Sequence, residues 1–438
     1  MRRLAWLSGF AALFLIACTA TAPTAPSPAV ETASDRLNRV VDDYFEELLK
    51  LNPILATSIG DPRYNDRYVV GIAPETRRAR QQLEQDYLGR IRGIDRAALS
   101  ESDRITYDVF KSGREREIEG FRFRDDLVPL NQFYSVPNSF AQLGSGTGMQ
   151  PFKTVKDYDN FLKRIDGFVA WTDQAIVNMR EGVRRGYTLP RVLTERVLPQ
   201  LDAHIVAQPE DSLYWGPIRN LPAGFPEADR ERLTAAYRAA ITTKIVPSYR
   251  KLRDYMRDEY LPKCRTTVGL DALPDGKAWY EYRVREITTT NYTPAQIHEI
   301  GLKEVARIRG EMQGVMAKVG FQGSLDDFFK FLNSDPQFFY ADKETLIAGY
   351  DDIRKRVNPQ LPRLFETLPK ADYEVRAVEP FREKSAAGGQ YQAASEDGSR
   401  PGIFYANTYD LKARPKWAME ALSLHEANPG HHFQISIQ

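Results

Sequence analysis

Apolar residues at every third or fourth position constrain the fold of this chain more than any other feature. This spacing places one apolar face along a helix, and it recurs in long segments with recognisable ends. Ser34 and Pro53 bracket the first such helix. The second begins with Thr154 and Asp157, which form a variant of the capping box, and ends at Gly186. The sequence therefore predicts a mainly α fold.

Two further long helices support the same prediction. One follows Thr293, which can cap it together with Gln296, and ends at Gly320. The other covers about residues 227–260 and contains Pro247, where we expect it to kink or divide because proline interrupts helical hydrogen bonding.

Strand patterns are few and short. The segments YEVRAVE, from Tyr373, and GIFYANT, from Gly402, are the clearest. The second strand leads into a helix that begins near Pro415, and its predicted apolar face consists of Trp417, Ala418, Ala421 and Leu424. We therefore expect a few short β-strands next to this helix.

The first twenty residues have the zones of a secretory signal. Arg2 and Arg3 precede an apolar run that is too short to span a bilayer about 30 Å thick. The run ends in Leu-Ile-Ala-Cys, which resembles the lipobox of bacterial lipoproteins, where cleavage precedes the cysteine and its thiol carries the lipid. We predict a signal peptide over 1–17, lipidation of Cys18, and a membrane-anchored, extracytoplasmic place in the bacterial cell envelope. An ordinary signal that ends at Cys18 is the alternative.

Composition indicates how the chain is divided, whether it can form a disulfide, and whether it suits a nucleic-acid partner. Residues 18–34, rich in Ala, Pro, Thr and Ser, are predicted to be a flexible tether, and 35–438 a single large helical domain. Apart from Cys18 the chain has only Cys264, so no intramolecular disulfide is expected after lipidation. The formal net charge of +1 argues against a nucleic-acid partner.

The stretch LHEANPGHHFQ holds three of the five histidines: His425, His431 and His432. Two histidines four positions apart on a helix can share one zinc ion, with a glutamate beside the metal-bound water. Glu426 stands in that position. However, His431 would lie about 9 Å from His425 along a straight helix, too far for two Zn–N bonds of about 2 Å.

Pro429 and Gly430 offer a solution to this spacing. Proline breaks the helical hydrogen bonding and glycine permits unusual backbone angles. Our hypothesis is that they bend the chain and bring His431 back toward His425. The alternative is a helix that ends at Asn428, a turn, and histidines that face solvent.

The block from Gly402 to Gln434 resembles the signature of the bacterial domain of unknown function 885 family, whose motif reads His-Glu-x-x-Pro-Gly-His. The segments NPILATSIGDPRYNDR, from Asn52, and VGLDALPDGKAWYEY, from Val268, also resemble that family. The resemblance extends from about residue 35 to the end. It implies a large helical architecture similar to zinc-metallopeptidases of the gluzincin type, in lipoproteins or secreted proteins.

By position, the resemblance implies that His425 and His431 are ligands of one zinc ion and that Glu426 is the general base. His432 would support the site or the transition state. In the family a further helix follows the motif and carries the third ligand. That ligand is expected after Gln438, so we expect the C-terminal part of the domain to be missing.

Roles are also expected for four residues outside the motif: Tyr405, Asn407, His204 and His298. Tyr405 and Asn407, on the strand just upstream, are the nearest candidates for substrate contacts. His204 and His298 are expected to be structural or exposed rather than ligands. Three functional hypotheses remain open: a lipid-anchored zinc metallopeptidase that hydrolyses peptide bonds, a non-catalytic envelope lipoprotein that binds peptides or a partner protein, and an inactive fragment. The sequence does not set the oligomeric state.

Overall fold

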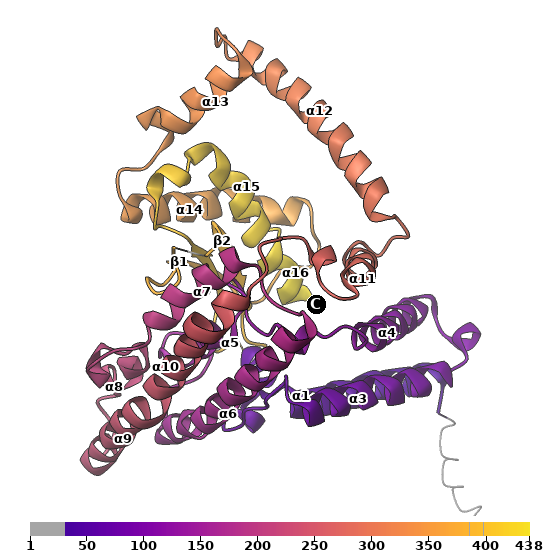
Figure 1. Cartoon of the computed structure of the whole chain (residues 1–438). Coiled ribbons are helices and arrows are strands. Elements are labelled where there is room, and N and C mark those ends of the chain that lie inside the picture. Colours follow the sequence, from indigo (N-terminus) through magenta and orange to yellow (C-terminus); the bar gives the residue numbers. More distant parts are fainter. Residues whose placement is uncertain (1–30, 385, 397) are drawn as a thin grey trace, which may run out of the picture.

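The computed structural model describes residues 31–384, 386–396 and 398–438 (Figure 1). Helices dominate these residues and the strands are short, which confirms the predicted mainly α fold. The predicted signal peptide over 1–17 and Cys18 lie outside the described residues. Within the described ranges, no helix is long and apolar enough to cross a membrane.

Three helices near the N-terminus pack side by side around a small core of their own (Figure 1). The N-terminal helices are α1 (Ala33–Leu51), α2 (Pro53–Ile59), α3 (Pro74–Arg92) and α4 (Glu101–Gly120). Leu37 and Tyr44 of α1 meet Ile91 of α3 in this core. Apolar residues at helical spacing therefore pack as the sequence predicts.

The start of α1 differs from the prediction. Thr32, not Ser34, caps the helix: its side chain accepts a hydrogen bond from the Asp35 amide, and the Asp35 carboxylate binds Thr32 in return. This reciprocal box satisfies two backbone donors at once, whereas the Ser34 hydroxyl binds Asp103 of α4 instead. Ala33 and Ser34 therefore belong to the folded domain and not to the tether predicted over 18–34.

The largest core surrounds α6 (Val155–Arg185), which has the predicted Thr154–Asp157 capping box and ends at Gly186, with φ of +80°. Stacked and tilted aromatic rings dominate this core: Phe168 lies 4.5 Å from Phe140 and 5.1 Å from Tyr249, measured between ring centroids. The surrounding helices are α5 (Val136–Gly144), α7 (Arg191–Asp202), α8 (Gly216–Arg219), α9 (Glu227–Ala240) and α10 (Val246–Tyr255).

The helical run over 227–260 divides near Pro247, as predicted. A π-helical turn over Ile241–Ile245 joins α9 to α10, and a second one covers Met256–Tyr260. In a π turn each backbone hydrogen bond spans five residues instead of four, so the turn is wider than that of an α-helix. The first π turn lies just before Pro247, which has no amide hydrogen to donate. The wider turn therefore lets the helix continue past the proline.

Arg164 of α6 fastens the segment after α1 to the main core. Its fully buried guanidinium donates hydrogen bonds to the carbonyl oxygens of Pro53, Tyr64 and Arg67, at 3.0–3.3 Å, and to the hydroxyl of Thr57. Burial lowers the pKa of Arg164 from 12.5 to about 10. One buried cation therefore holds several loop carbonyls in place.

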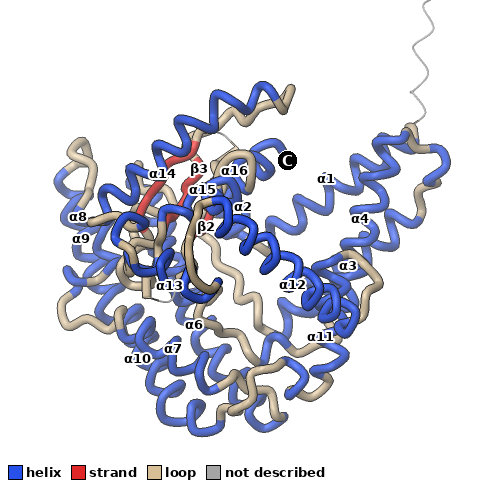
Figure 2. The backbone as a smooth tube through the Cα atoms, turned by 90° about the horizontal axis from the view of Figure 1, so that it is seen from above, coloured by secondary structure: helices blue, strands red, loops and turns tan. Residues whose placement is uncertain are grey.

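The C-terminal part contains a three-stranded sheet covered by helices (Figure 2). Its elements are β1 (Tyr373–Ala377), β2 (Gly389–Gln392), β3 (Gly402–Ala406), α14 (Lys343–Val357), α15 (Lys416–Glu426) and α16 (His431–Ile437). The central strand, β3, is fully buried, parallel to β1 and antiparallel to β2. The strands at Tyr373 and Gly402 are confirmed, whereas β2 was not predicted.

The motif helix α15 begins after Pro415, as predicted, but it buries a different face. Met419, Ser423 and Glu426 are buried, whereas most of the predicted face is exposed: Trp417, Ala421 and Leu424, with Ala418 half-buried. The Trp417 indole instead donates a hydrogen bond to the Leu332 carbonyl at the surface. The prediction failed because the inward face includes the polar Ser423 and Glu426, which apolar periodicity does not count.

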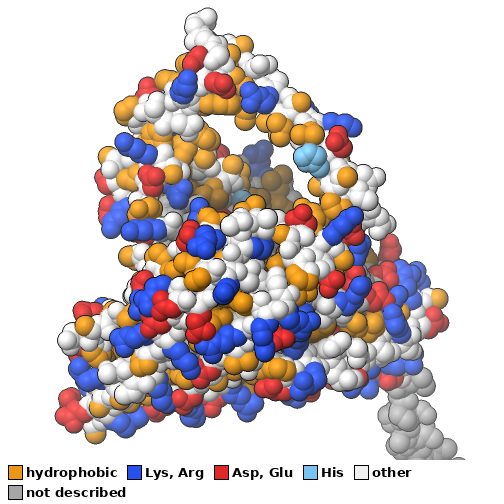
Figure 3. All heavy atoms as spheres, viewed as in Figure 1, with side chains coloured by type: hydrophobic (Ala, Val, Ile, Leu, Met, Phe, Trp, Pro, Cys, Tyr) orange, Lys and Arg blue, Asp and Glu red, His pale blue; other side chains and the backbone are white. Residues whose placement is uncertain are grey.

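An arch of two helices stands off the body of the molecule (Figures 1 and 3). It is formed by α12 (Pro294–Lys318) and α13 (Leu325–Ser334), which follow α11 (Gly276–Thr288). Thr293 and Gln296 cap α12 as predicted, but no residue of this helix is buried. Hydrophobic side chains line the opening beneath it in Figure 3; the large exposed ones on α12 are Ile300, Leu302, Val305, Ile308, Met312 and Val315.

Candidate active site

Four residues, Ala427 to Gly430, separate α15 from α16 and interrupt the helix. The imidazole rings of His425, in the last turn of α15, and His431, the first residue of α16, lie 4.7 Å apart between centroids and 82° apart in plane. The hypothesis that the Pro-Gly segment brings these side chains together is therefore confirmed. Gly430 is needed for this close return, because a side chain there would collide with the carbonyl oxygens of Leu424 and His425.

Glu426 lies beside this pair but points inward. Its side chain is only 7% exposed and packs over Gly389 of β2, where an added Cβ would lie 3.0 Å from the Glu426 Cγ. Burial raises the pKa of its carboxyl, while His431, His425 and a hydrogen bond from the Tyr391 backbone amide act in the opposite direction. The carboxylate is therefore held between a strand and two imidazoles.

His432 is held by the protein itself. It is 1% exposed; its Nδ1 accepts a hydrogen bond from the Tyr391 hydroxyl at 2.8 Å, and its Nε2 donates to the Ala371 carbonyl at 3.1 Å. Burial lowers the pKa of this imidazole, which favours the neutral ring. Because both ring nitrogens already have protein partners, His432 offers none to a metal ion or a substrate.

The structure does not bring Tyr405 and Asn407 to the motif. Along β3, Phe404 and Ala406 face the α14–α15 side of the sheet, so Tyr405 faces the opposite side, where burial raises its pKa to about 12. The Asn407 side chain donates to two loop carbonyls, at 2.8 and 3.1 Å, and accepts from the Tyr409 amide. Both side chains organise the sheet and its loops.

Tyr391 is the residue near the motif that the sequence did not indicate. Its backbone amide binds Glu426 and its hydroxyl binds His432, so one residue of β2 contacts two members of the motif. Gly402 of the neighbouring β3 leaves room for this contact, because an added Cβ would collide with the Tyr391 hydroxyl. The only sequence signal was a four-residue strand, too short to recognise by alternation.

The imidazoles of His425 and His431 are suited to fill two of the four ligand positions around a tetrahedral zinc ion. Ring centres on the order of 5 Å apart are expected for two imidazoles on one tetrahedral zinc ion with Zn–N bonds of about 2 Å, close to the observed 4.7 Å. Among the described residues, no group of three or more His, Cys, Asp or Glu side chains is arranged to hold a metal ion. The other two histidines lie apart from the site: His298 is exposed on α12, and His204 is buried in the α6 core.

Comparisons with known proteins place the chain among bacterial proteins. A family model described as "Bacterial protein of unknown function (DUF885)" matches residues 53–438. A "putative lipoprotein" from Colwellia psychrerythraea has a similar fold, with a TM-score of 0.83 and 22% identity over 93% of this chain and 73% of that one. A lipoprotein of unknown function from Shewanella oneidensis, also described as putative, has a TM-score of 0.57 and 14% identity over 92% and 71%. No curated protein matches the chain.

Proposed function

Because this chain belongs to the bacterial DUF885 family of unknown function, we propose, from the chemistry of its motif, that it is a zinc-dependent peptidase. His425 and His431 would hold the ion and Glu426 would act as the general base. The observation that carries this proposal is the pairing of the two imidazole rings, 4.7 Å apart, beside the buried Glu426. Imidazole and carboxylate together are the side chains that catalytic zinc sites use.

Glu426 would move the proton in this reaction. A bound zinc ion supplies Lewis acidity, which polarises a peptide carbonyl and lowers the pKa of water toward about 7. Burial favours the protonated form of Glu426, whereas the two histidines favour the ionised form. A carboxyl group under such opposed influences can accept a proton from the attacking water and later deliver it to the leaving amine.

His432 and Tyr391 would serve as positioning residues. The hydrogen bonds of His432 to Tyr391 and to the Ala371 carbonyl tie the first turn of α16 to the sheet. His431 belongs to the same turn, so these bonds fix the direction from which its imidazole approaches His425. Fixed ligand geometry of this kind is what supports metal affinity.

The same proposal includes the location of the enzyme. The signal over 1–17 and the lipobox-like end at Cys18 would place a lipid anchor before the domain, in the cell envelope, and the descriptions of the two structural relatives as lipoproteins support this. Expression with a radiolabelled fatty acid tests it. We expect label and membrane association in the wild type and neither in Cys18→Ser; label in Cys18→Ser would contradict the assignment.

Peptide hydrolysis tests the activity directly. Purified, zinc-supplemented protein is incubated with a mixture of unmodified peptides, and the products are identified by mass spectrometry. We expect cleavage in the wild type, a loss of at least about 100-fold in Glu426→Gln, and full activity in Glu420→Gln, an exposed glutamate of the same helix. Equal cleavage by Glu426→Gln would contradict the proposal. Bound zinc without any cleavage would instead support a peptide-binding lipoprotein.

A further inference from the structure

A cavity of about 710 Å³ lies among α3, α4, α5, α6 and α11, and none of the motif residues lines it. Its volume is in the range of pockets that hold small organic ligands, roughly 300–1,000 Å³. The segment between α1 and α2 and the loop that follows Tyr68 complete its walls. The cavity is therefore distinct in its residues from the proposed metal site.

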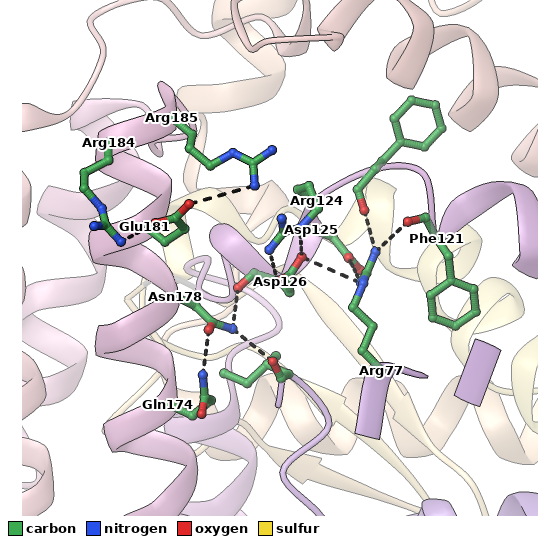
Figure 4. A network of polar contacts seen from close by, with 12 residues as sticks. Arg77, Phe121, Arg124, Asp125, Asp126, Gln174, Asn178, Glu181, Arg184 and Arg185 are labelled. Atoms are coloured by element: carbon green, nitrogen blue, oxygen red, sulfur yellow. Dashed lines mark hydrogen bonds and ion pairs between the residues drawn. The ribbon is translucent and has the colours of Figure 1, made fainter. Parts of the chain in front are cut away.

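A network of polar contacts fixes this cavity before any ligand arrives (Figure 4). Arg77 of α3 forms an ion pair with Asp125 and donates hydrogen bonds to the carbonyls of Phe121 and Phe123, at 3.1 and 2.6 Å. Asn178 of α6 donates to the carbonyls of Ile72 and Asp126, at 3.0 and 3.1 Å. Three separate segments are thereby joined, so the pocket is preformed.

Several aromatic side chains line part of the cavity. The Phe123 and Trp279 rings are stacked, 5.7 Å apart at an angle of 8°, and Tyr282 lies beside Phe123 at 5.2 Å. Trp171 of α6 and Phe140 of α5 also line the cavity. Such a wall takes up apolar or aromatic groups, because flat rings bury large apolar areas and stack on other rings.

Two exposed aromatic residues follow the lining residue Asn131. Phe133 and Tyr134 are 53% and 83% exposed, yet the Asn131 side chain holds their backbone by accepting from both amides, at 2.8 and 2.6 Å. Two large aromatic side chains are thus held in solvent by an ordered turn, two and three residues after a residue that lines the cavity.

Two charged side chains at the cavity are available to a ligand. Arg80 of α3 and Glu117 of α4 line it, and neither side chain has a hydrogen bond or ion pair with any described residue. The other charged groups in the wall neutralise one another, as in the pairs Arg77–Asp125 and Arg283–Glu286. A ligand could therefore place a carboxylate against Arg80 and an amine against Glu117.

We propose that this cavity binds short peptides with free termini, through an apolar or aromatic side chain laid against the aromatic wall and the termini near Arg80 and Glu117. The proposal rests on the proposed peptidase function for the identity of the ligand as a peptide. The cavity then favours Phe, Tyr or Trp in the bound peptide over small or charged residues.

Peptide binding to the full chain carrying Glu426→Gln tests this inference without turnover. The probes are Ala-Phe-Ala and Ala-Ala-Ala, titrated by calorimetry and by tryptophan fluorescence, which reports on Trp171 and Trp279 in the wall. We expect Ala-Phe-Ala to bind at least tenfold more tightly than Ala-Ala-Ala, because the phenylalanine side chain moves a large apolar surface from water into the cavity. Similar affinities for both peptides would overturn the proposal.

Two pairs of variants locate the binding. Gly71 lines the cavity and Gly89 of α3 does not, and both have open space around an added side chain. Gly71→Leu should weaken binding of Ala-Phe-Ala at least tenfold, whereas Gly89→Leu should not change it. Arg80→Ala should weaken binding about two- to fivefold relative to Arg78→Ala, an exposed arginine of the same helix outside the cavity.

Each result separates this inference from the proposed function. Equal binding by Gly71→Leu and Gly89→Leu would place the peptide elsewhere and overturn the inference, whatever the zinc content of the protein. The same titration in His425→Ala distinguishes the two sites: retained aromatic selectivity there supports the cavity as a separate subsite. Loss of that selectivity in His425→Ala, with unchanged circular dichroism, would overturn it.

Discussion

His204 should make this protein less stable in mild acid. Its buried imidazole packs against the rings of Tyr214, Tyr249 and Phe381, and its Nε2 has no hydrogen-bond partner among the described residues. Burial lowers its pKa from 6.5 to about 4. The folded state therefore binds the proton less tightly than the unfolded chain, so stability is complete above about pH 6.5 and is lost as the pH falls toward 4.

The expected loss follows from these two pKa values. The whole shift corresponds to about 3 kcal/mol, of which about 2 kcal/mol is lost between pH 7 and pH 5. His204→Phe keeps an aromatic ring and removes the titrating group. Urea unfolding, followed by circular dichroism at both pH values, should show that the wild type loses about 2 kcal/mol more than His204→Phe. Equal losses in the two proteins would refute the reasoning.

Three further predictions concern stability and are checked by urea or thermal unfolding. Arg164→Met should cost about 3–5 kcal/mol, because it leaves several buried loop carbonyls without a donor; a cost below about 1 kcal/mol would contradict this. Leu346→Ala, at a fully buried position, should lower the free energy of unfolding by about 2–5 kcal/mol. Ile308→Ala, on the exposed helix α12, should lower it by no more than about 0.5 kcal/mol. Similar losses in the two variants would contradict the exposed position of α12. Tyr391→Phe should cost about 1 kcal/mol through its lost bond to His432, and an unchanged melting temperature would exclude that bond.

The helices were predictable because local chemistry decides where they begin and end. Thr154 and Thr293 cap their helices with the residue three positions on, and Pro247 follows an altered helical turn that divides the predicted run. These signals need no knowledge of the rest of the fold. The start of α1 was wrong because two hydroxyl residues, Thr32 and Ser34, could each serve as the cap, and contact with α4 decided between them.

The motif was predictable in part for the same reason. Pro429 and Gly430 mark a break that neighbouring residues alone reveal, and the return of His431 to His425 follows from it. The surroundings of the motif depend on contacts distant in sequence. Tyr391 comes from a strand of four residues. The sequence also cannot tell which face of β3 the motif helix covers, and Tyr405, the proposed substrate contact, lies on the other face.

Metal content tests the central claim most directly. Wild type, Glu426→Ala, His425→Ala and His431→Ala are purified after exposure to zinc and measured by inductively coupled plasma mass spectrometry, with His298→Ala as the control for an exposed histidine elsewhere. The account predicts bound zinc in wild type, Glu426→Ala and His298→Ala, and its loss in both motif histidine variants. Well-folded wild-type protein without zinc, or zinc retained in His425→Ala and His431→Ala, would contradict it.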